Sequence, residues 1–202
     1  MHDIEPYYQW RDYYIAADDE LSLFFGQESD EFQFTNKVYN YYIHPQWDEF
    51  GSSTLYLKVL FVDYEEGYAI IELIGEWNDT LHNDVMELKR EIIDTMINKK
   101  ISKFIMISEH VLNFHASDDS YYEEWYEDVK DEAGWIVMLG VQKHVVDEMN
   151  QTRLFQYLLY GEQWNLINWR AFTPMQLYEA IDRFIEHPKL LLDVNPQQKK
   201  LK

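Results

Sequence analysis

The sequence predicts an α/β domain built on one mixed sheet, in which an antiparallel hairpin leads into parallel strands, with four helices. Three observations carry this prediction. Residues 55–75 form two apolar segments on either side of a turn that ends at Gly67, which is typical of a β-hairpin. Residues 81–96 repeat apolar side chains at helical spacing. Two short apolar runs, 103–107 and 135–141, are each followed by a helical pattern, which is the order of a parallel sheet with crossover helices.

Turn and cap signals set the expected element boundaries in the first half of the chain. A strand is expected over 37–43, and His44-Pro45 ends it because proline has no N–H for a ladder. The tripeptide Asn78-Asp79-Thr80 is expected to cap the first helix. The apolar face of that helix is expected to consist of Leu81, Val85, Leu88, Ile92 and Met96.

Helix boundaries order the second half. Ser120-Tyr121-Tyr122-Glu123 has the pattern of a capping box, and Gly134 is expected to stop the helix that runs to about Glu132. The elements expected after it are a strand over 135–141, a helix over 144–160, a strand over 167–172, and a last helix that starts at the capping box Thr173-Pro174-Met175-Gln176 and ends before Pro188.

Three regions divide the chain. Residues 1–50 are expected to form an acidic extension, with one strand, that packs on the body, and residues 51–190 to form the domain. Residues 191–202 are expected to be a flexible tail. The aromatic side chains expected to hold the extension on the body are Tyr7, Tyr8, Trp10, Tyr13, Tyr14, Phe24 and Phe25.

Charge and composition exclude several classes of function. The 202 residues include 17 Lys and Arg against 37 Asp and Glu, a formal net charge of −20, so binding to nucleic acid or to anionic membranes is not expected. The absence of cysteine excludes disulfides and thiolate metal sites and suits the cytoplasm. The first residues have neither the basic nor the apolar region of a signal peptide, and the apolar runs are too short to span a bilayer.

Three stretches of the chain resemble the STAS domain, the fold of bacterial anti-sigma-factor antagonists. Residues 68–75 with the helix after them are similar to the second strand and first helix of that family, 103–119 to the third strand and the loop that holds its phosphorylatable serine, and 134–141 to the fourth strand. The resemblance places Ser117 at that serine. The family motif Asp-Ser-Ser/Thr-Gly is otherwise replaced here by Ala116, Asp118 and Asp119.

The loop before the second helix is the predicted site. Ser117, Asp118, Asp119, Ser120 and Glu123 are candidates for binding a partner or an anion, because a helix N-terminus offers free N–H groups; simple helix capping is the alternative. Asp118 and Asp119 already supply negative charge, so Ser117 is not expected to be a regulatory phosphosite. His115, Asp118 and Asp119, with Glu123, are a weak candidate for a cation site, since they match no known spacing.

A protein-binding role is the leading functional hypothesis. Residues 109–133 hold nine acids against one base, which suits docking of a basic protein partner, although a merely solvated face has the same composition. No cofactor is expected, since the sequence lacks hydrolase, P-loop and dinucleotide motifs. The alternatives are an enzyme, small-molecule-binding or metal-dependent, with its site at the strand carboxyl ends, and a carrier of apolar ligands. The oligomeric state does not follow from the sequence.

We expect neither double-stranded DNA nor anionic vesicles to bind at a physiological ionic strength of about 0.15 M. A surface with this net charge repels phosphate, and no basic stripe compensates. Electrophoretic mobility shift and vesicle co-sedimentation measure the two cases. Saturable micromolar binding in either assay would contradict the expectation.

Overall fold

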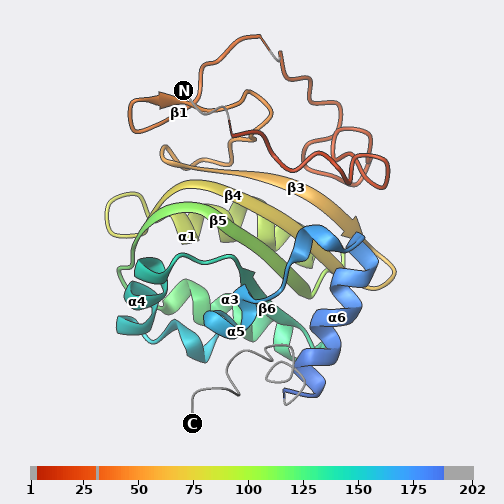
Figure 1. The fold of residues 1–202 in the computed structure, drawn as a ribbon, viewed down its shortest axis with the longest axis vertical. Helices are drawn as coiled ribbons and strands as arrows, with labels where there is room; N and C mark the ends of the chain where they lie inside the picture. The colour runs from red at the N-terminus through yellow and green to blue at the C-terminus, as the bar shows by residue number, and fades with distance from the viewer. Residues whose placement is uncertain (1–3, 31, 189–202) are drawn as a thin grey trace, which may run out of the picture.

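A four-stranded mixed sheet forms the centre of the molecule (Figure 1). The computed structural model describes residues 4–30 and 32–188. In the sheet β3 is antiparallel to β4, whereas β4, β5 and β6 are parallel to one another, which confirms the predicted fold class. The strands in spatial order are β3 (Leu55–Asp63), β4 (Tyr68–Asn78), β5 (Lys103–His115) and β6 (Trp135–Leu139).

β5 is much longer than the predicted strand over 103–107. Relative to β4 it contains an extra residue at two places, between Ile107 and His110 and between Val111 and Asn113. Each such bulge shifts the alternation of side chains between the two faces of the sheet. The polar residues after Ile107 therefore lack a strand pattern, although they belong to the strand.

The predicted helix over 81–96 begins later than expected. α1 (Asp84–Glu87), a π-helical turn η1 (Leu88–Ile93) and α2 (Asp94–Ile97) follow one another without a break. Leu81 precedes this helix and is 75% exposed, so its assignment to the apolar face is wrong. From the sequence, Asp79 is expected to cap a helix that begins at Leu81. Its carboxylate instead accepts the N–H of Val85, six residues further on, at 2.9 Å, and the helix begins at Asp84.

The remaining helices and short turns follow in sequence. They are α3 (Ser120–Lys130), α4 (Lys143–Gln151), η2 (Leu154–Gln156), α5 (Glu162–Asn165), η3 (Trp169–Ala171) and α6 (Pro174–Glu186). The capping box at Thr173 forms as predicted. The helix expected over 144–160 ends at Gln151, and Leu159 instead makes a single parallel bridge to Val137 of β6.

The predicted strand over 167–172 is wrong. Those residues contain the 3₁₀ turn η3, and Trp169 in that turn is 2% exposed. Its indole N–H donates to the carboxylate of Glu109 at 2.8 Å. The segment is apolar because the ring of Trp169 packs on the sheet, and not because it forms a strand.

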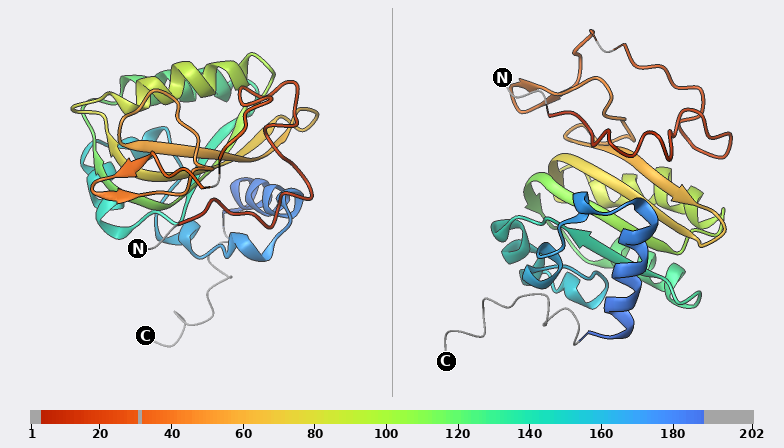
Figure 2. Two further views of the ribbon diagram at one scale, coloured as in Figure 1. Left: turned by 90° about the horizontal axis from the view of Figure 1, so that it is seen from above. Right: turned by 45° about the vertical axis from the view of Figure 1, so that its right-hand side comes forward.

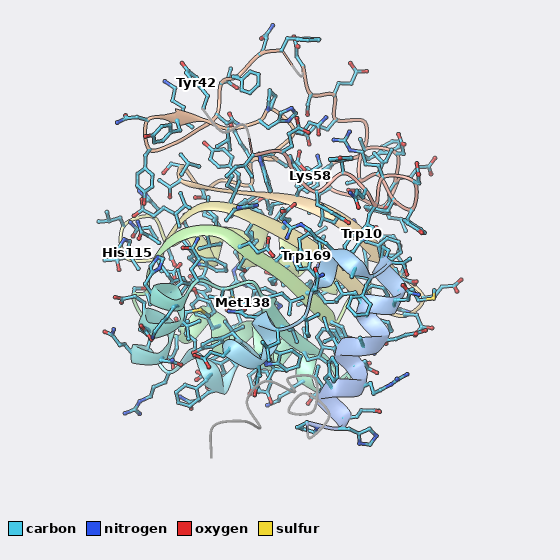
Figure 3. The ribbon with its side chains drawn as sticks, viewed as in Figure 1. Trp10, Tyr42, Lys58, His115, Met138 and Trp169 are labelled. Carbon is cyan, nitrogen blue, oxygen red and sulfur yellow. The ribbon has the colours of Figure 1, made fainter. Side chains whose placement is uncertain are left out.

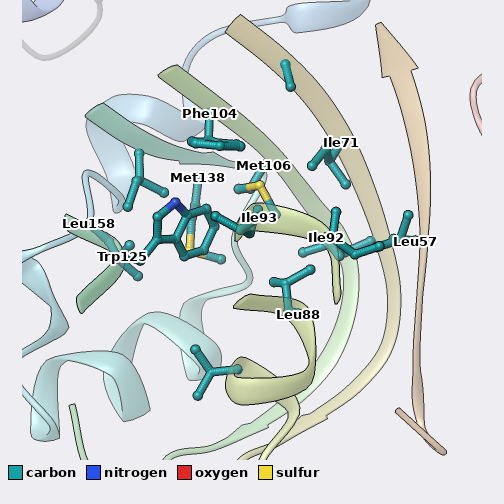
Figure 4. Packing of buried hydrophobic residues seen from close by; sticks show 14 of the residues in the cluster. Leu57, Ile71, Leu88, Ile92, Ile93, Phe104, Met106, Trp125, Met138 and Leu158 are labelled. Atoms are coloured by element: carbon teal, nitrogen blue, oxygen red, sulfur yellow. The ribbon is translucent and has the colours of Figure 1, made fainter. Parts of the chain in front are cut away.

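Helices cover both faces of the sheet (Figure 2). The α1–η1–α2 helix, α3 and α4 bury one face, where Leu88, Ile92 and Trp125 pack on strand residues (Figure 4). α5, η3 and α6 bury the other face, and Trp10 of the N-terminal extension joins them. Within the described residues, no helix has the length and apolar character to cross a bilayer.

The N-terminal extension lies along the outer side of β3 (Figure 1). Asp48 pairs with Leu57 of β3 through two backbone hydrogen bonds. The strand predicted over 37–43 is instead a small hairpin, β1 (Lys37–Val38) and β2 (Tyr41–Tyr42), because Tyr39 adopts a left-handed φ of 54° that turns the chain. The tail predicted over 191–202 lies outside the described residues.

The aromatic side chains expected to hold the extension differ in burial, and Tyr7 and Tyr14 are half-buried and pack against the body. Trp10 and Phe24 are buried on the body, as expected. Tyr8, Tyr13 and Phe25 are each more than half exposed, so the expectation that they pack on the body is wrong.

Leu88→Ala is expected to lower the free energy of unfolding by about 2–5 kcal/mol, because it leaves a cavity at a fully buried site. The matched control is Leu81→Ala, the same change at an exposed position, with an expected effect within about 0.5 kcal/mol. Denaturant unfolding measures both. A loss below about 1 kcal/mol for Leu88→Ala would contradict the packing of this helix.

Candidate functional site

The loop between β5 and α3 is tied to the loop that follows β4. The backbone N–H groups of Asp79 and Thr80 donate to the carbonyl oxygen of His115 at 2.9 and 3.2 Å. The Thr80 hydroxyl donates to the carbonyl of Ala116 at 3.1 Å. Because β4 and β5 are parallel, their carboxyl ends lie at one edge of the sheet, and these bonds join the two loops there.

The predicted site residues lie together but do not form the predicted capping box. Ser120 is the first residue of α3, and its N–H and hydroxyl both donate to the carboxylate of Asp118. These hydrogen bonds lower the pKa of Asp118. Asp119 accepts the hydroxyl of Tyr157 at 3.2 Å, and Ser117 is exposed. The N-cap position of α3 is Asp119, and the carboxylate of Asp118 before it, and not a Ser120–Glu123 pair, accepts the first N–H of the helix.

The weak candidates for a cation site are not brought together. His115 Nε2 lies 3.1 Å from a carboxylate oxygen of Glu76, while Asp118 and Asp119 are bonded to Ser120 and Tyr157. Within residues 4–30 and 32–188, no three His, Asp or Glu side chains converge as the ligands of a metal ion would.

Four acids form a stripe along α3. Asp119, Glu123, Glu127 and Asp131 are spaced four residues apart, so they follow one side of the helix. Asp119 is half-buried and the other three are exposed. Lys130 contacts Glu127. We call these four residues the acidic stripe.

Two further acids of α3 face the neighbouring helix. Arg90 makes a bidentate ion pair with Glu124, at 2.5 and 2.8 Å. The fully buried side chain of Lys89 reaches Asp128 at 2.8 Å and also contacts Asp94. Glu124 and Asp128 are therefore structural, and the charge available to a partner on α3 is that of the acidic stripe.

A buried carboxylate anchors the first turns of α3. Asp79 accepts the hydroxyl of Tyr122 at 2.6 Å and the indole N–H of Trp77 at 2.9 Å. Burial raises the pKa of Asp79 to about 6. Asp84, also buried, accepts the N–H of Asn78 at 2.7 Å. The ionisable groups beneath the loop are thus engaged by the chain's own donors.

A second polar cluster lies where the N-terminal extension meets the sheet. Glu72, in the middle of β4, is 1% exposed and accepts the N–H of Tyr7 at 2.7 Å. His110 Nε2 lies 3.9 Å from the other carboxylate oxygen. Nearby, Glu109 forms an ion pair with Arg170 at 2.6 Å. Burial raises the pKa of Glu72 to about 7 and lowers that of His110.

Three aromatic rings close this second cluster. Tyr7, Trp10 and Trp169 contact one another edge to face, with ring centroids 4.7–5.5 Å apart. Figure 3 labels Trp10 and Trp169. The Arg170 guanidinium lies over the Trp169 ring, 4.2 Å from its centroid. The cluster joins the N-terminal extension and the turn η3 to the sheet, and its groups contact one another.

Sequence reasoning did not single out Glu72 or Asp84 as site residues. The signal for Glu72 was a single charged residue inside the apolar run 68–75, which indicates a buried group with a partner.

The hollow between the extension and β3, of about 60 Å³ and lined in part by Trp10, Tyr14 and Lys58, lies away from the strand carboxyl ends.

Comparisons with known proteins concern the fold. A scan of protein families finds no match, and no curated protein matches the sequence. Among solved structures, the anti-sigma factor antagonist SpoIIAA in its unphosphorylated form has a TM-score of 0.45 at 16% identity, covering 64% of this chain and 96% of that chain. The Bacillus cell fate determinant SpoIIAA in its phosphorylated form has a TM-score of 0.40 at 16% identity, covering 63% and 97%. These neighbours are STAS-domain proteins, the family that the sequence resembles.

Glu72→Gln is expected to remove a pH-dependent loss of stability. The pKa of about 7 in the folded state exceeds the ordinary 4.5, so between these values the native state keeps a proton that the unfolded state has lost. The free energy of unfolding of the unaltered protein therefore falls as the pH rises through this window. Glutamine keeps an acceptor for the Tyr7 N–H and carries no charge.

The gain from Glu72→Gln should be near zero at pH 4.5 and on the order of 3 kcal/mol above pH 7. Denaturant titrations across this range measure it, with the exposed Glu66→Gln as control. An unchanged pH dependence in Glu72→Gln would show that the carboxylate is hydrated in the folded state.

Proposed function

We propose that this protein is a non-enzymatic binding module that docks a basic segment of another protein on the acidic stripe and the adjoining loop. The observation that carries the proposal is the spacing of Asp119, Glu123, Glu127 and Asp131. Like charges four residues apart destabilise a helix by about 0.2–0.5 kcal/mol per pair. Glu123 and Glu127 form such a pair within α3, and Asp119 and Asp131 extend the run of negative charge at its two ends. A basic partner would relieve the repulsion along the stripe.

The strand carboxyl ends favour binding over catalysis. Catalytic carboxylates need access to a substrate. Asp79 and Asp84 are buried beneath the joined loops and accept hydrogen bonds from Tyr122, Trp77 and Asn78. The exposed groups at this end of the sheet are those of the β5–α3 loop, those of residues 80–82 after β4, and the start of the acidic stripe.

The rigid support of the stripe suits a docking surface. Tyr122 ties α3 to the end of β4, and Arg90 ties it to the neighbouring helix. A surface that is already ordered loses little conformational entropy when a partner binds. We infer that the partner meets a preformed face.

Glu123→Lys combined with Glu127→Lys is expected to weaken binding of a basic probe about tenfold. Each exposed ion pair contributes about 0.2–1 kcal/mol, and each reversal also adds repulsion, so two reversals approach the 1.4 kcal/mol of a tenfold change. The probe is an acetylated and amidated peptide of alternating lysine and serine, titrated into isotopically labelled protein and followed by amide chemical shifts.

The matched control is Glu65→Lys combined with Glu66→Lys, two exposed acids in the β3–β4 turn. It makes the same change in net charge at another place. Binding at about 0.01 M salt should exceed that at about 0.1 M, because the Debye length falls from about 30 to about 10 Å. Equal weakening by both double variants would mean that the overall charge, and not the stripe, attracts the peptide.

A further inference from the structure

Exposed apolar side chains are concentrated in the N-terminal extension. Among the described residues, ten large apolar side chains are exposed before residue 43 and four after it. Those of the β1–β2 hairpin are Tyr39, Tyr41 and Tyr42, which are 51%, 66% and 37% exposed. Clustered exposed aromatic residues mark interaction surfaces more often than isolated ones do.

The tip of this hairpin is strained. Tyr39 has a φ of 54°, in the left-handed region where glycine is the usual residue of a tight hairpin turn. A bulky side chain there is an outlier that the surrounding structure must hold in place. Tyr39 therefore places an aromatic ring at the tip, where glycine would adopt the same backbone conformation with less strain.

A small core beneath the hairpin holds the tip in place. Val38 and Ile43 are buried against Trp47, Tyr56 and Ile74. Their burial fixes the hairpin over the second half of β4, to which Ile74 belongs. Burial of Val38 and Ile43 therefore holds the tip residues Tyr39 and Tyr41, here called the tyrosine tip, in place at the surface.

The tip lies near the carboxyl end of β5, where the loop of the predicted site begins, although the hairpin packs on the face of the sheet opposite α3. The side-chain amide of Asn113 donates to the hydroxyl of Tyr39. Asn113 is two residues before His115, where β5 ends and the loop to α3 begins. Figures 1 and 2 show the hairpin above the end of the sheet from which this loop leaves.

Cations are the ligands that suit these rings. The chain itself places Lys37 over the ring of Tyr42, 4.3 Å from its centroid, and Arg90 over Tyr121, at 5.5 Å. A net charge of −20 opposes association with a second copy of the chain and with nucleic acid or anionic lipid. An arginine- or lysine-containing segment is attracted by both the charge and the rings.

We propose that the tyrosine tip, Tyr39 and Tyr41, takes arginine side chains of the basic segment that the acidic stripe binds, where that segment passes around the carboxyl end of β5. This inference rests on the proposed function. Arginine fits better than lysine, because its planar guanidinium stacks on aromatic rings and is more weakly hydrated.

The test compares two peptides, alternating arginine with serine and lysine with serine, on four forms of the full chain. The forms are the unaltered protein, Tyr39→Gly with Tyr41→Thr, the control Tyr8→Thr with Tyr13→Thr, and Glu123→Lys with Glu127→Lys. Tyr8 and Tyr13 are each 58% exposed in the same extension. Glycine suits the φ of residue 39, and unchanged amide shifts of Val38 and Ile43 would show that the hairpin remains folded.

The expected result is that the arginine peptide shifts the amides of residues 39–42 and 113 together with those of α3. Loss of the two rings should weaken its binding about fivefold or more, with a smaller effect on the lysine peptide and none from the control.

Unaltered arginine-peptide binding in the tyrosine variant, with loss in the stripe variant, would overturn this inference and leave the proposed function standing. No shift on α3 in the unaltered protein would overturn the proposed function and this inference together. Shifts of residues 39–42 that depend on protein concentration alone would identify a second copy as the occupant and also overturn it.

Discussion

The parallel pairing of β4 with β5 is the constraint on which the rest of the structure depends. Ten residue pairs join the two strands, and neither strand lies at an edge of the sheet. Parallel strands must be covered on both faces, so helices are needed on one side and α6, η3 and the N-terminal extension on the other. The same pairing brings the carboxyl ends of both strands to the same end of the sheet, where the carbonyl oxygen of His115 accepts hydrogen bonds from the loop after β4. The candidate site therefore lies where it does because β4 and β5 run in the same direction.

Several bases of the described residues join elements of the fold through ion pairs. Lys89 and Arg90 neutralise acids of α3, Lys58 pairs with Asp48 beside β3, and Arg170 pairs with Glu109. Each of these ion pairs engages an acid as well as a base, so they leave the formal net charge of −20 unchanged.

The fold was predictable to the extent that side-chain periodicity determines it. The hairpin and the helical face from Val85 to Met96 were recognisable from spacing alone. Errors arose where one side chain acts over a distance: Asp79 caps Val85 across a loop, and the ring of Trp169 mimics a strand pattern. The position of the loop before α3 was predictable from the helix signal at Ser120, and its role as a site stays a prediction. The buried state of Glu72 was not, because its partner, the N–H of Tyr7, is 65 residues away in the sequence.

The bridge between Asp48 and Leu57 has a consequence for the behaviour of the chain in concentrated solution. β3 is an edge strand, and its side chains from Leu55 to Val62 are mostly apolar. An uncovered edge of this kind is a template for strands of other molecules. The N-terminal extension lies along this edge and takes both backbone hydrogen bonds of Leu57. Besides carrying the tyrosine tip, the extension thereby shields the sheet from edge-to-edge aggregation.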